Sequence, residues 1–376
     1  MSVYLDNSAT TKPCPAAVKK ALEMMECTFG NPSSLHMYGI EAKKELDSAR
    51  HTLSNFLSCD DSEIYFTSGG TAANNTAIIG TARAKKRDGK KIITTLLEHP
   101  SVLKHFEMLE SLGFEAVYLK PDKNGKVSLD LISNAVDENT VLVSVMAVNN
   151  EVGSIQEISK IKEIIKNKKS SAYFHCDAVQ AFGKIPLKPK KLGIDLMSMS
   201  AHKIHGIKGA GALFVDKNIR ILPSILGGGQ ENGLVSGTEP LPAICAFSEA
   251  VKDIGNMEKN LENTKRLRDY FLGKINNTDG ITVNSPLDAL PYIINISVKG
   301  VPSQVMLNAL SAEGIYVSAG SACSKGHRSG VLSSMGVRAA EIDSAVRISL
   351  SKSTDEKDID LLYNGIANTV KRVRRK

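Results

Sequence analysis

Short apolar runs alternate with longer segments of helical character along the first two thirds of the chain. The apolar runs are bounded by polar residues or glycine, which is typical of buried strands; they cover 63–67, 91–95, 116–119, 141–148 and 172–176. The helical segments between them cover 15–25, 39–57, 72–88, 101–112, 129–136 and 158–167. Strands separated by helices predict an α/β fold with a mainly parallel sheet covered on both faces.

Two further apolar runs, 194–199 and 210–215, enclose the polar stretch SMSAHKIHGIKG at 198–209. Lys203 therefore lies between two predicted core strands. Desolvation and neighbouring cations would lower its pKa and make its amine nucleophilic, as a Schiff-base lysine requires. The alternative for this stretch alone is a lysine on a tight, exposed turn.

The pattern changes after Gly229. Residues 241–275 are strongly helical, and shorter predicted strands at 292–298 and 346–350 alternate with helices. A chain of 376 residues is too long for one small core. We therefore expect two domains. The large cofactor-binding domain comprises 13–252, and the smaller α/β domain comprises 1–12 with 253–376.

Composition narrows the class of protein. A hydrophobic share of 42% with 23% charged residues is ordinary for a globular protein, and no apolar run approaches the roughly 20 residues of a membrane span. The N-terminus lacks the features of a secretory signal, and the six cysteines are scattered without a CxxC pair. These observations predict a cytoplasmic protein with reduced thiols, no membrane partner and no metal site.

The net charge of +7 is concentrated at the C-terminus, where 371–376 carry five basic residues. A solvated tail is one interpretation, and an arm for an acidic partner or RNA phosphates is the other. The chain has no recognised nucleic-acid motif and no aromatic residues between basic ones, so direct nucleic-acid binding is not expected.

Polar residues follow several predicted strands, at the sheet edge where α/β proteins bind ligands. The turn Ser68-Gly69-Gly70-Thr71 opens a helix, so its amides and the Thr71 hydroxyl could hold a phosphate; a turn that only caps a helix is the alternative. Asp177 ends a later strand, one crossover before Lys203. An anion site, a carboxylate and a buried lysine are together what pyridoxal phosphate needs.

With these motifs in place, the chain resembles the cysteine desulfurases, in the class V aminotransferase group of fold-type-I pyridoxal phosphate enzymes. The resemblance extends from YLDNSATT at 4–11 to RIS at 347–349. Between them lie, in the family's order, TSGGTAANN, EHPSV, NNEVGSIQ, HCDAVQ, SMSAHKIHGIKG, GGGQENGLVSGT and SAGSACS. It implies a seven-stranded-type sheet, a smaller C-terminal α/β domain, and the branch of the family whose cysteine lies in a long loop.

The resemblance also implies roles for individual residues. Lys203 would form the internal aldimine, and Asp177 would pair with the pyridinium of the cofactor. His99 would stack on the ring and share proton transfers, and Gln180 would hydrogen-bond the ring phenolate. An isolated histidine at position 99 would otherwise be interpreted as structural.

Phosphate and substrate contacts are implied in the same way. The phosphate would be held by Gly70, Thr71, Ser200 and His202, and by Thr238 from the neighbouring subunit of a homodimer. The substrate carboxylate would bind Asn150 and Arg347. A guanidinium suits that task because it grips a carboxylate through two charge-assisted hydrogen bonds; the alternative is a surface arginine on an edge strand.

Cys323 lies in SAGSACSKGHRSG at 318–330, a segment of small residues and glycines. Lys325, His327 and Arg328 make its neighbourhood positive, which favours thiolate over thiol. The other five cysteines lack this setting, and Cys176 is expected to be a small core residue. Cys323 is therefore the predicted nucleophile.

The predicted function is that of an L-cysteine desulfurase, which leaves a persulfide on Cys323 and releases alanine. The sulfur would pass to an iron–sulfur scaffold protein or a tRNA-thiolation enzyme. Alternatives are a selenocysteine lyase, a cysteine sulfinate desulfinase, another class V aminotransferase, or a non-catalytic binding protein. Asn232 and Val235 stand where the family usually has arginines, which bears on the sulfur acceptor.

Overall fold

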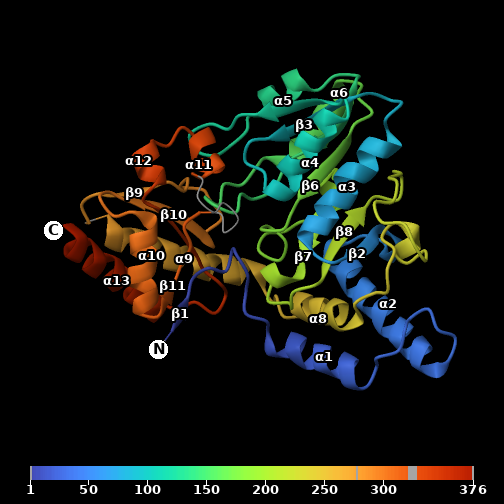
Figure 1. Ribbon diagram of the computed structural model, residues 1–376, viewed down its shortest axis with the longest axis horizontal. Coiled ribbons are helices and arrows are strands. Elements are labelled where there is room, and N and C mark those ends of the chain that lie inside the picture. The colour runs from blue at the N-terminus through green and yellow to red at the C-terminus, as the bar shows by residue number, and fades with distance from the viewer. Residues whose placement is uncertain (1, 277, 321–327, 375–376) are drawn as a thin grey trace.

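A computed structural model describes residues 2–276, 278–320 and 328–374 and contains a seven-stranded sheet, as predicted (Figure 1). The strand order is β2-β8-β7-β6-β5-β3-β4. The neighbours from β7 through β6, β5 and β3 to β4 pair in parallel, whereas β8 is antiparallel to both β7 and β2. The strands are β2 (Ile64–Thr67), β3 (Lys91–Thr95), β4 (Glu115–Leu119), β5 (Thr140–Ser144), β6 (Tyr173–Asp177), β7 (Leu196–Ser200) and β8 (Gly211–Val215).

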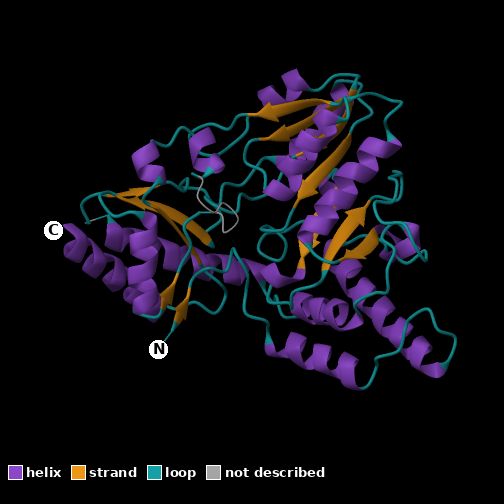
Figure 2. Ribbon diagram, viewed as in Figure 1, coloured by secondary structure: helices purple, strands orange, loops and turns teal. Residues whose placement is uncertain are grey.

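Helices cover both faces of this sheet (Figure 2). Side chains alternate between faces along a strand, so Ile93 and Phe214 join one core cluster while Ile92 and Leu213 join clusters on the other face. The first face packs against α1 (Pro15–Glu26), α2 (Met37–Leu57), α5 (Leu129–Ala135), α6 (Ile161–Asn167) and α8 (Leu241–Lys252). The second packs against α3 (Gly70–Ala84) and α4 (Pro100–Ser111). Short helical turns are η1 (Asp61–Glu63), η2 (Ile158–Lys160), α7 (Pro189–Leu192), η3 (Ala201–Lys203) and η4 (Glu231–Gly233).

The C-terminal part builds a second, smaller sheet of order β12-β10-β9. The strands are β9 (Ile281–Val283), β10 (Ile293–Val298) and β12 (Ala345–Ser349), and β1 (Val3–Tyr4) pairs in parallel with β11 (Ile315–Tyr316). The helices are α9 (Met257–Ile275), α10 (Ser303–Ala312), α11 (Gly330–Ser334), α12 (Ala339–Ile342) and α13 (Glu356–Arg374).

Except for α11 and α12, which pack in the core of the large sheet, these elements share a second core cluster, which includes Val3 and Leu5 from the N-terminus as well as residues between 267 and 370. The first strand thus packs with the C-terminal part of the chain. The division into a domain of 13–252 and a domain of 1–12 with 253–376 stays a prediction.

Two predicted elements differ in extent from those in the structure. The helix predicted over 241–275 is two helices, α8 and α9, because Gly255 between them has a φ of +68°, which a helix does not accommodate. The strand predicted over 141–148 ends at Ser144, and the apolar residues beyond it are buried in a connection that lies under the site. A continuous run of apolar residues indicates that the segment is buried, but it does not show where the hydrogen-bonded pairing of the strand ends.

Cys14, Cys27, Cys59, Cys176 and Cys245 are all free thiols, as predicted, and Cys176 is fully buried in the core. Cys323 lies outside the described residues. Among the helices of the described ranges, none combines the length and apolar character needed to cross a membrane.

Candidate active site

A cavity of about 460 Å³ opens at the carboxyl ends of β2, β3, β6 and β7, where the sequence predicted a ligand site. It brings together ten predicted site residues: Gly70, Thr71, His99, Asn150, Asp177, Gln180, Ser200, His202, Lys203 and Arg347. Thr238 is exposed and is not among the residues that line this cavity. The predicted Cys323 lies outside the described residues, although Arg328 beyond it is described.

Lys203 follows β7 directly, at the end of the short turn η3. Its Nζ donates to the carbonyl oxygens of Ser8 at 2.5 Å and Ala9 at 2.8 Å. The side chain is half-buried and lines the cavity, so the alternative of a lysine on an exposed turn is wrong. The N-terminal segment is fixed against this turn because Thr11 N donates to His202 O at 2.9 Å.

Asp177 ends β6, and hydrogen bonds fix both oxygens of its carboxylate. Oδ2 accepts from Asn74 Nδ2 at 2.7 Å, and Oδ1 accepts from the backbone of Val179 at 2.9 Å. Asn74 lies one turn into α3 and also donates to Ser101 Oγ at 2.8 Å. The carboxylate is therefore held rigidly at the cavity wall, facing the same space as Lys203.

His99 caps the N-terminus of α4, because its Nδ1 accepts from the backbone of Ser101 at 3.1 Å. A nitrogen that accepts carries no proton, so the neutral ring bears its proton on Nε2. Burial lowers the pKa of His99; Asp177 raises it and Lys203 lowers it, with a net decrease. The histidine has a structural role as a cap and in addition lines the cavity.

One end of the cavity has the chemistry of an anion site. Gly70 and Thr71 form the first turn of α3, where backbone amides point outward without helical partners. Ser200 Oγ and Ser8 Oγ are buried and have no hydrogen-bond partner among the described residues. A Cβ on Gly70 would lie 2.6 Å from Val179 Cγ2, so only glycine keeps this turn open.

Cations surround the same end. Lys208 and Lys203 both line the cavity, and so does His202, which directly precedes Lys203. Burial, assisted by these two lysines, lowers the pKa of His202 to about 4. Orphaned hydroxyls, free amides and positive charge fit a phosphate.

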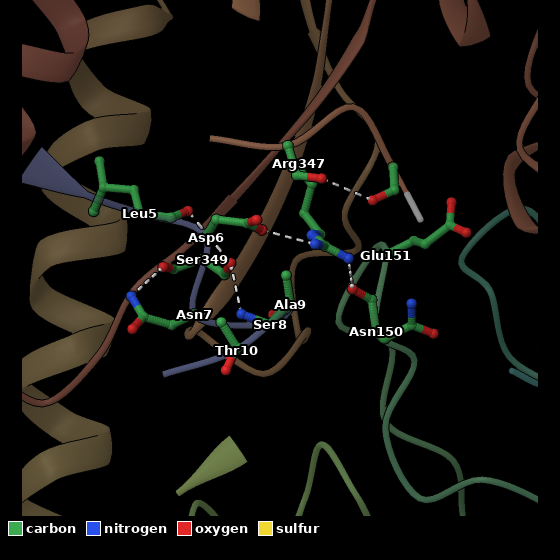
Figure 3. Close-up of polar contacts among 12 residues, drawn as sticks. Leu5, Asp6, Asn7, Ser8, Ala9, Thr10, Asn150, Glu151, Arg347 and Ser349 are labelled. Atoms are coloured by element: carbon green, nitrogen blue, oxygen red, sulfur yellow. Dashed lines mark hydrogen bonds and ion pairs between the residues drawn. The ribbon is translucent and has the colours of Figure 1, made fainter. Parts of the chain in front are cut away.

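Arg347 lies on β12 and is only 2% exposed, so the alternative of a surface arginine on an edge strand is wrong. Its Nη1 donates to Asn150 O at 3.0 Å, and its Nη2 donates to Asp6 Oδ1 at 2.8 Å (Figure 3). Its Nε has no hydrogen-bond partner among the described residues. Arg347 lines the cavity, so its guanidinium could bind an incoming carboxylate there.

Gln180 is tied into the same network. Its Nε2 donates to Ser8 O at 2.9 Å, and its Oε1 accepts from Lys184 Nζ at 3.2 Å. Sequence reasoning assigned no role to Asp6, Asn74 or Lys184. Asp6 and Asn74 are within the matched motifs YLDNSATT and TSGGTAANN, whereas Lys184 follows the last matched residue of HCDAVQ by four positions.

The chain is similar over almost its whole length to known proteins. The sequence model of the family described as Aminotransferase class-V matches residues 3–362. The chain is 39% identical to the cysteine desulfurase IscS of Methanosarcina thermophila over 99% of this chain and 93% of that protein. It is also 39% identical to the cysteine desulfurase IscS of Clostridium botulinum, over 99% and 95% of the two chains.

Solved structures show the same fold. A structure titled NIFS-like protein superposes with a TM-score of 0.94 at 36% identity, covering 99% of this chain and 100% of that one. A NifS-like protein from Rickettsia africae superposes with a TM-score of 0.89 at 30% identity, covering 99% and 100%. The predicted fold class is confirmed.

Proposed function

This chain belongs to the class V aminotransferase family, and we propose that its cavity converts L-cysteine to L-alanine and transfers the sulfur to Cys323. The observation that carries the proposal is the convergence of ten predicted residues, from six separate segments of the chain, on the cavity around Lys203. The relatives named cysteine desulfurase, matched over nearly their whole length, support the same reaction.

The cofactor is pyridoxal phosphate, and the site residues fit it. The first turn of α3 with Thr71, Ser200 and His202 would hold the phosphate, because unpartnered donors and positive charge gather there. Asp177 would face the pyridine nitrogen, and Lys203 would supply the amine. When bound, pyridoxal phosphate supplies the electron sink for the bonds at the substrate's Cα.

Substrate binding depends on Arg347 and Asn150. Arg347 is buried and held by Asn150 O and by Asp6, so its guanidinium is oriented before substrate arrives. A charge-assisted pair with the substrate carboxylate would then hold the substrate in the cavity that Lys203 also lines.

Two residues of the chain would handle protons. The Lys203 amine would remove the proton from the substrate's Cα, because it lies half-buried and lines the cavity. His99 is held neutral by burial and presents Nε2–H as a donor. It would therefore stabilise charge or return a proton without carrying a permanent charge itself.

Cys323 is the proposed sulfur acceptor within the chain. The Cβ–S bond of the substrate breaks, an S–S bond forms on the Cys323 sulfur, and the electron pair of the broken bond stays with carbon. The Cβ then takes a proton, so the net products are alanine and a Cys323 persulfide. The five other cysteines are free but are not among the residues that line the cavity.

We also propose a homodimer, because Thr238 is exposed in one chain and would reach the phosphate only in a neighbouring subunit. The persulfide would pass to an iron–sulfur scaffold protein or a tRNA-thiolation enzyme in the cytoplasm. Asn232, in the loop at η4, would influence which acceptor is accommodated.

The decisive experiment measures alanine release from L-cysteine by the cofactor-loaded protein with a thiol reductant. Cys323→Ala should keep the visible absorbance of the cofactor and lose persulfide formation, whereas Cys27→Ala, which removes an exposed thiol, should turn over normally. Full turnover by Cys323→Ala would contradict the assignment. Parallel assays with selenocysteine test whether the enzyme is instead a lyase for which Cys323 is dispensable.

A further inference from the structure

Lys184 is a buried lysine that the proposed chemistry does not use. It lies in the turn after β6, its residue is 8% exposed, and its Nζ is 5.8 Å from the centroid of the Tyr292 ring. It also lines a small cavity of about 30 Å³ together with Lys203. Burying an amine is costly unless it is hydrogen-bonded, so the partner of Lys184 Nζ matters.

The charges that act on Lys184 are cationic. Burial, with smaller contributions from Lys203 and Arg347, lowers the pKa of Lys184 to about 7. His205 and Lys352 line the same small cavity and are also basic. An ion pair that stabilises a positive charge is therefore not the reason for a lysine at this position.

The polar contact of Lys184 is with Gln180, the residue predicted to contact the cofactor ring. Lys184 Nζ donates to Gln180 Oε1 at 3.2 Å, and on the other side Gln180 Nε2 donates to Ser8 O at 2.9 Å. Turning the amide over would place Nε2 against Nζ and Oε1 against a carbonyl oxygen. Both ends of the amide therefore require the same orientation.

We propose that Lys184 is a positioning residue that fixes the Gln180 amide with its NH₂ group toward the amine of Lys203. Ser8 O, which accepts from Gln180, also accepts from Lys203 Nζ, so the NH₂ group and the amine converge on one acceptor. An apolar side chain at position 184 would fill the space but leave the amide free to turn.

The consequence, which rests on the proposed function, concerns the cofactor when it is bound to Lys203. A fixed NH₂ donor on Gln180 would stabilise the anionic form of the ring oxygen that it faces. This hydrogen bond therefore lowers the pH at which the visible absorbance of the bound cofactor titrates. If Lys184 is lost, the donor is no longer fixed and this titration should move to higher pH.

The test is a pH titration of that absorbance in the holoenzyme without substrate. Lys184→Met should raise the apparent pKa by about one unit, the size of one hydrogen bond to a charged group. In a protein that already carries Gln180→Ala, Lys184→Met should shift this apparent pKa by less than about a third of a unit, because the two residues act through one contact. Equal shifts in both backgrounds would mean a direct charge effect and would overturn the proposal.

Control variants test whether the shift is specific to Lys184. Lys188→Met removes a lysine that donates to Phe56 O and lies over an aromatic ring away from Gln180, so it should leave the titration unchanged. If Lys184→Met does not retain cofactor, Lys184→Gln is carried through the same two backgrounds under the same criterion. Absence of any visible absorbance in the wild type would instead refute the proposed function.

Discussion

Arg347 on β12 and Asp6 near the N-terminus form a buried ion pair, with Nη2 and Oδ1 2.8 Å apart. Arg347 is 2% exposed, whereas the Asp6 side chain is 21% exposed (Figure 3). The predicted substrate-binding cation is thus already compensated by a carboxylate of its own chain. A substrate carboxylate must therefore bind a guanidinium that is already paired with the carboxylate of Asp6.

Asp6→Asn is expected to lower the KM for L-cysteine about threefold, because the amide keeps an acceptor for Nη2 but removes the competing negative charge. The free energy of unfolding should fall by about 1–3 kcal/mol, since Arg347 would then be a buried cation with no anion beside it. Steady-state kinetics and denaturant unfolding check the two effects. A tenfold rise in KM would show that Asp6 orients Arg347 more than it competes.

Gly70→Ala should abolish tight cofactor binding while leaving the chain folded. The added Cβ would lie 2.6 Å from Val179 Cγ2 and 3.4 Å from Ser200 Cβ, so the first turn of α3 must shift away from the anion site. We expect at least a tenfold weaker retention of pyridoxal phosphate, measured by absorbance after dialysis.

Gly273→Ala is the matched control, because a Cβ on this α9 residue would contact nothing within 4 Å. It should retain cofactor normally and stabilise the protein slightly, by about 0.5–1 kcal/mol. Equal cofactor retention by the two variants would remove Gly70 from the anion site.

Glu98→Gln should change how stability depends on pH. Burial, with a smaller contribution from Asp177, raises the pKa of Glu98 from 4.5 to about 8. The folded state therefore prefers the protonated acid, and its stabilising contribution is complete below pH 4.5 and is lost as pH rises through about 8.

The wild type should accordingly lose stability between pH 5 and pH 9 by on the order of 2 kcal/mol more than Glu98→Gln. The amide can keep both acceptor contacts of Oε1, with Met146 N and Thr95 Oγ1. Thermal unfolding at several pH values measures this difference, and Glu138→Gln at an exposed position is the control. Parallel pH profiles for wild type and Glu98→Gln would contradict the buried-acid interpretation.

Asn74→Ala should affect both stability and cofactor retention, because Asn74 joins Asp177 to Ser101. Its removal leaves a buried carboxylate oxygen with one fewer donor, which should cost about 1–3 kcal/mol of unfolding free energy. Cofactor should dissociate about tenfold faster if Asp177 must be held in place to pair with the ring. Asn55→Ala, on the exposed face of α2, should change neither quantity.

The sheet, its helices and most of the residues that line the cavity could be predicted from the sequence. The hydrophobic pattern indicated where the strands end, and the family motifs lie at those ends. The residues that were missed act through contacts made by side chains far apart in sequence. Asp6 and Arg347 show this well, since no periodicity relates a residue before the first helix to one on the last strand. Lys184 is another case, because its burial depends on tertiary packing, which places its Nζ over the ring of Tyr292.

The direction of β8 also lay beyond sequence patterning. A short buried strand has the same composition whether it pairs in parallel or antiparallel, and only the short connection from Ser200 to Gly211 allows β8 to return beside β7. The return places the Lys203 turn between two adjacent strands. The short length of this connection was the feature of the sequence that could have indicated the antiparallel direction of β8.

The position of residues 4–11 has a consequence for biosynthesis. Asn7 Nδ2 donates to Ser349 O at 2.8 Å, and Lys203 and Gln180 both donate to Ser8 O. Residues 4–11 are thus synthesised long before their partner strand β12. A nascent chain can fold its large sheet while the pocket is still open on one side, so closure of the pocket must wait until β12 has been made.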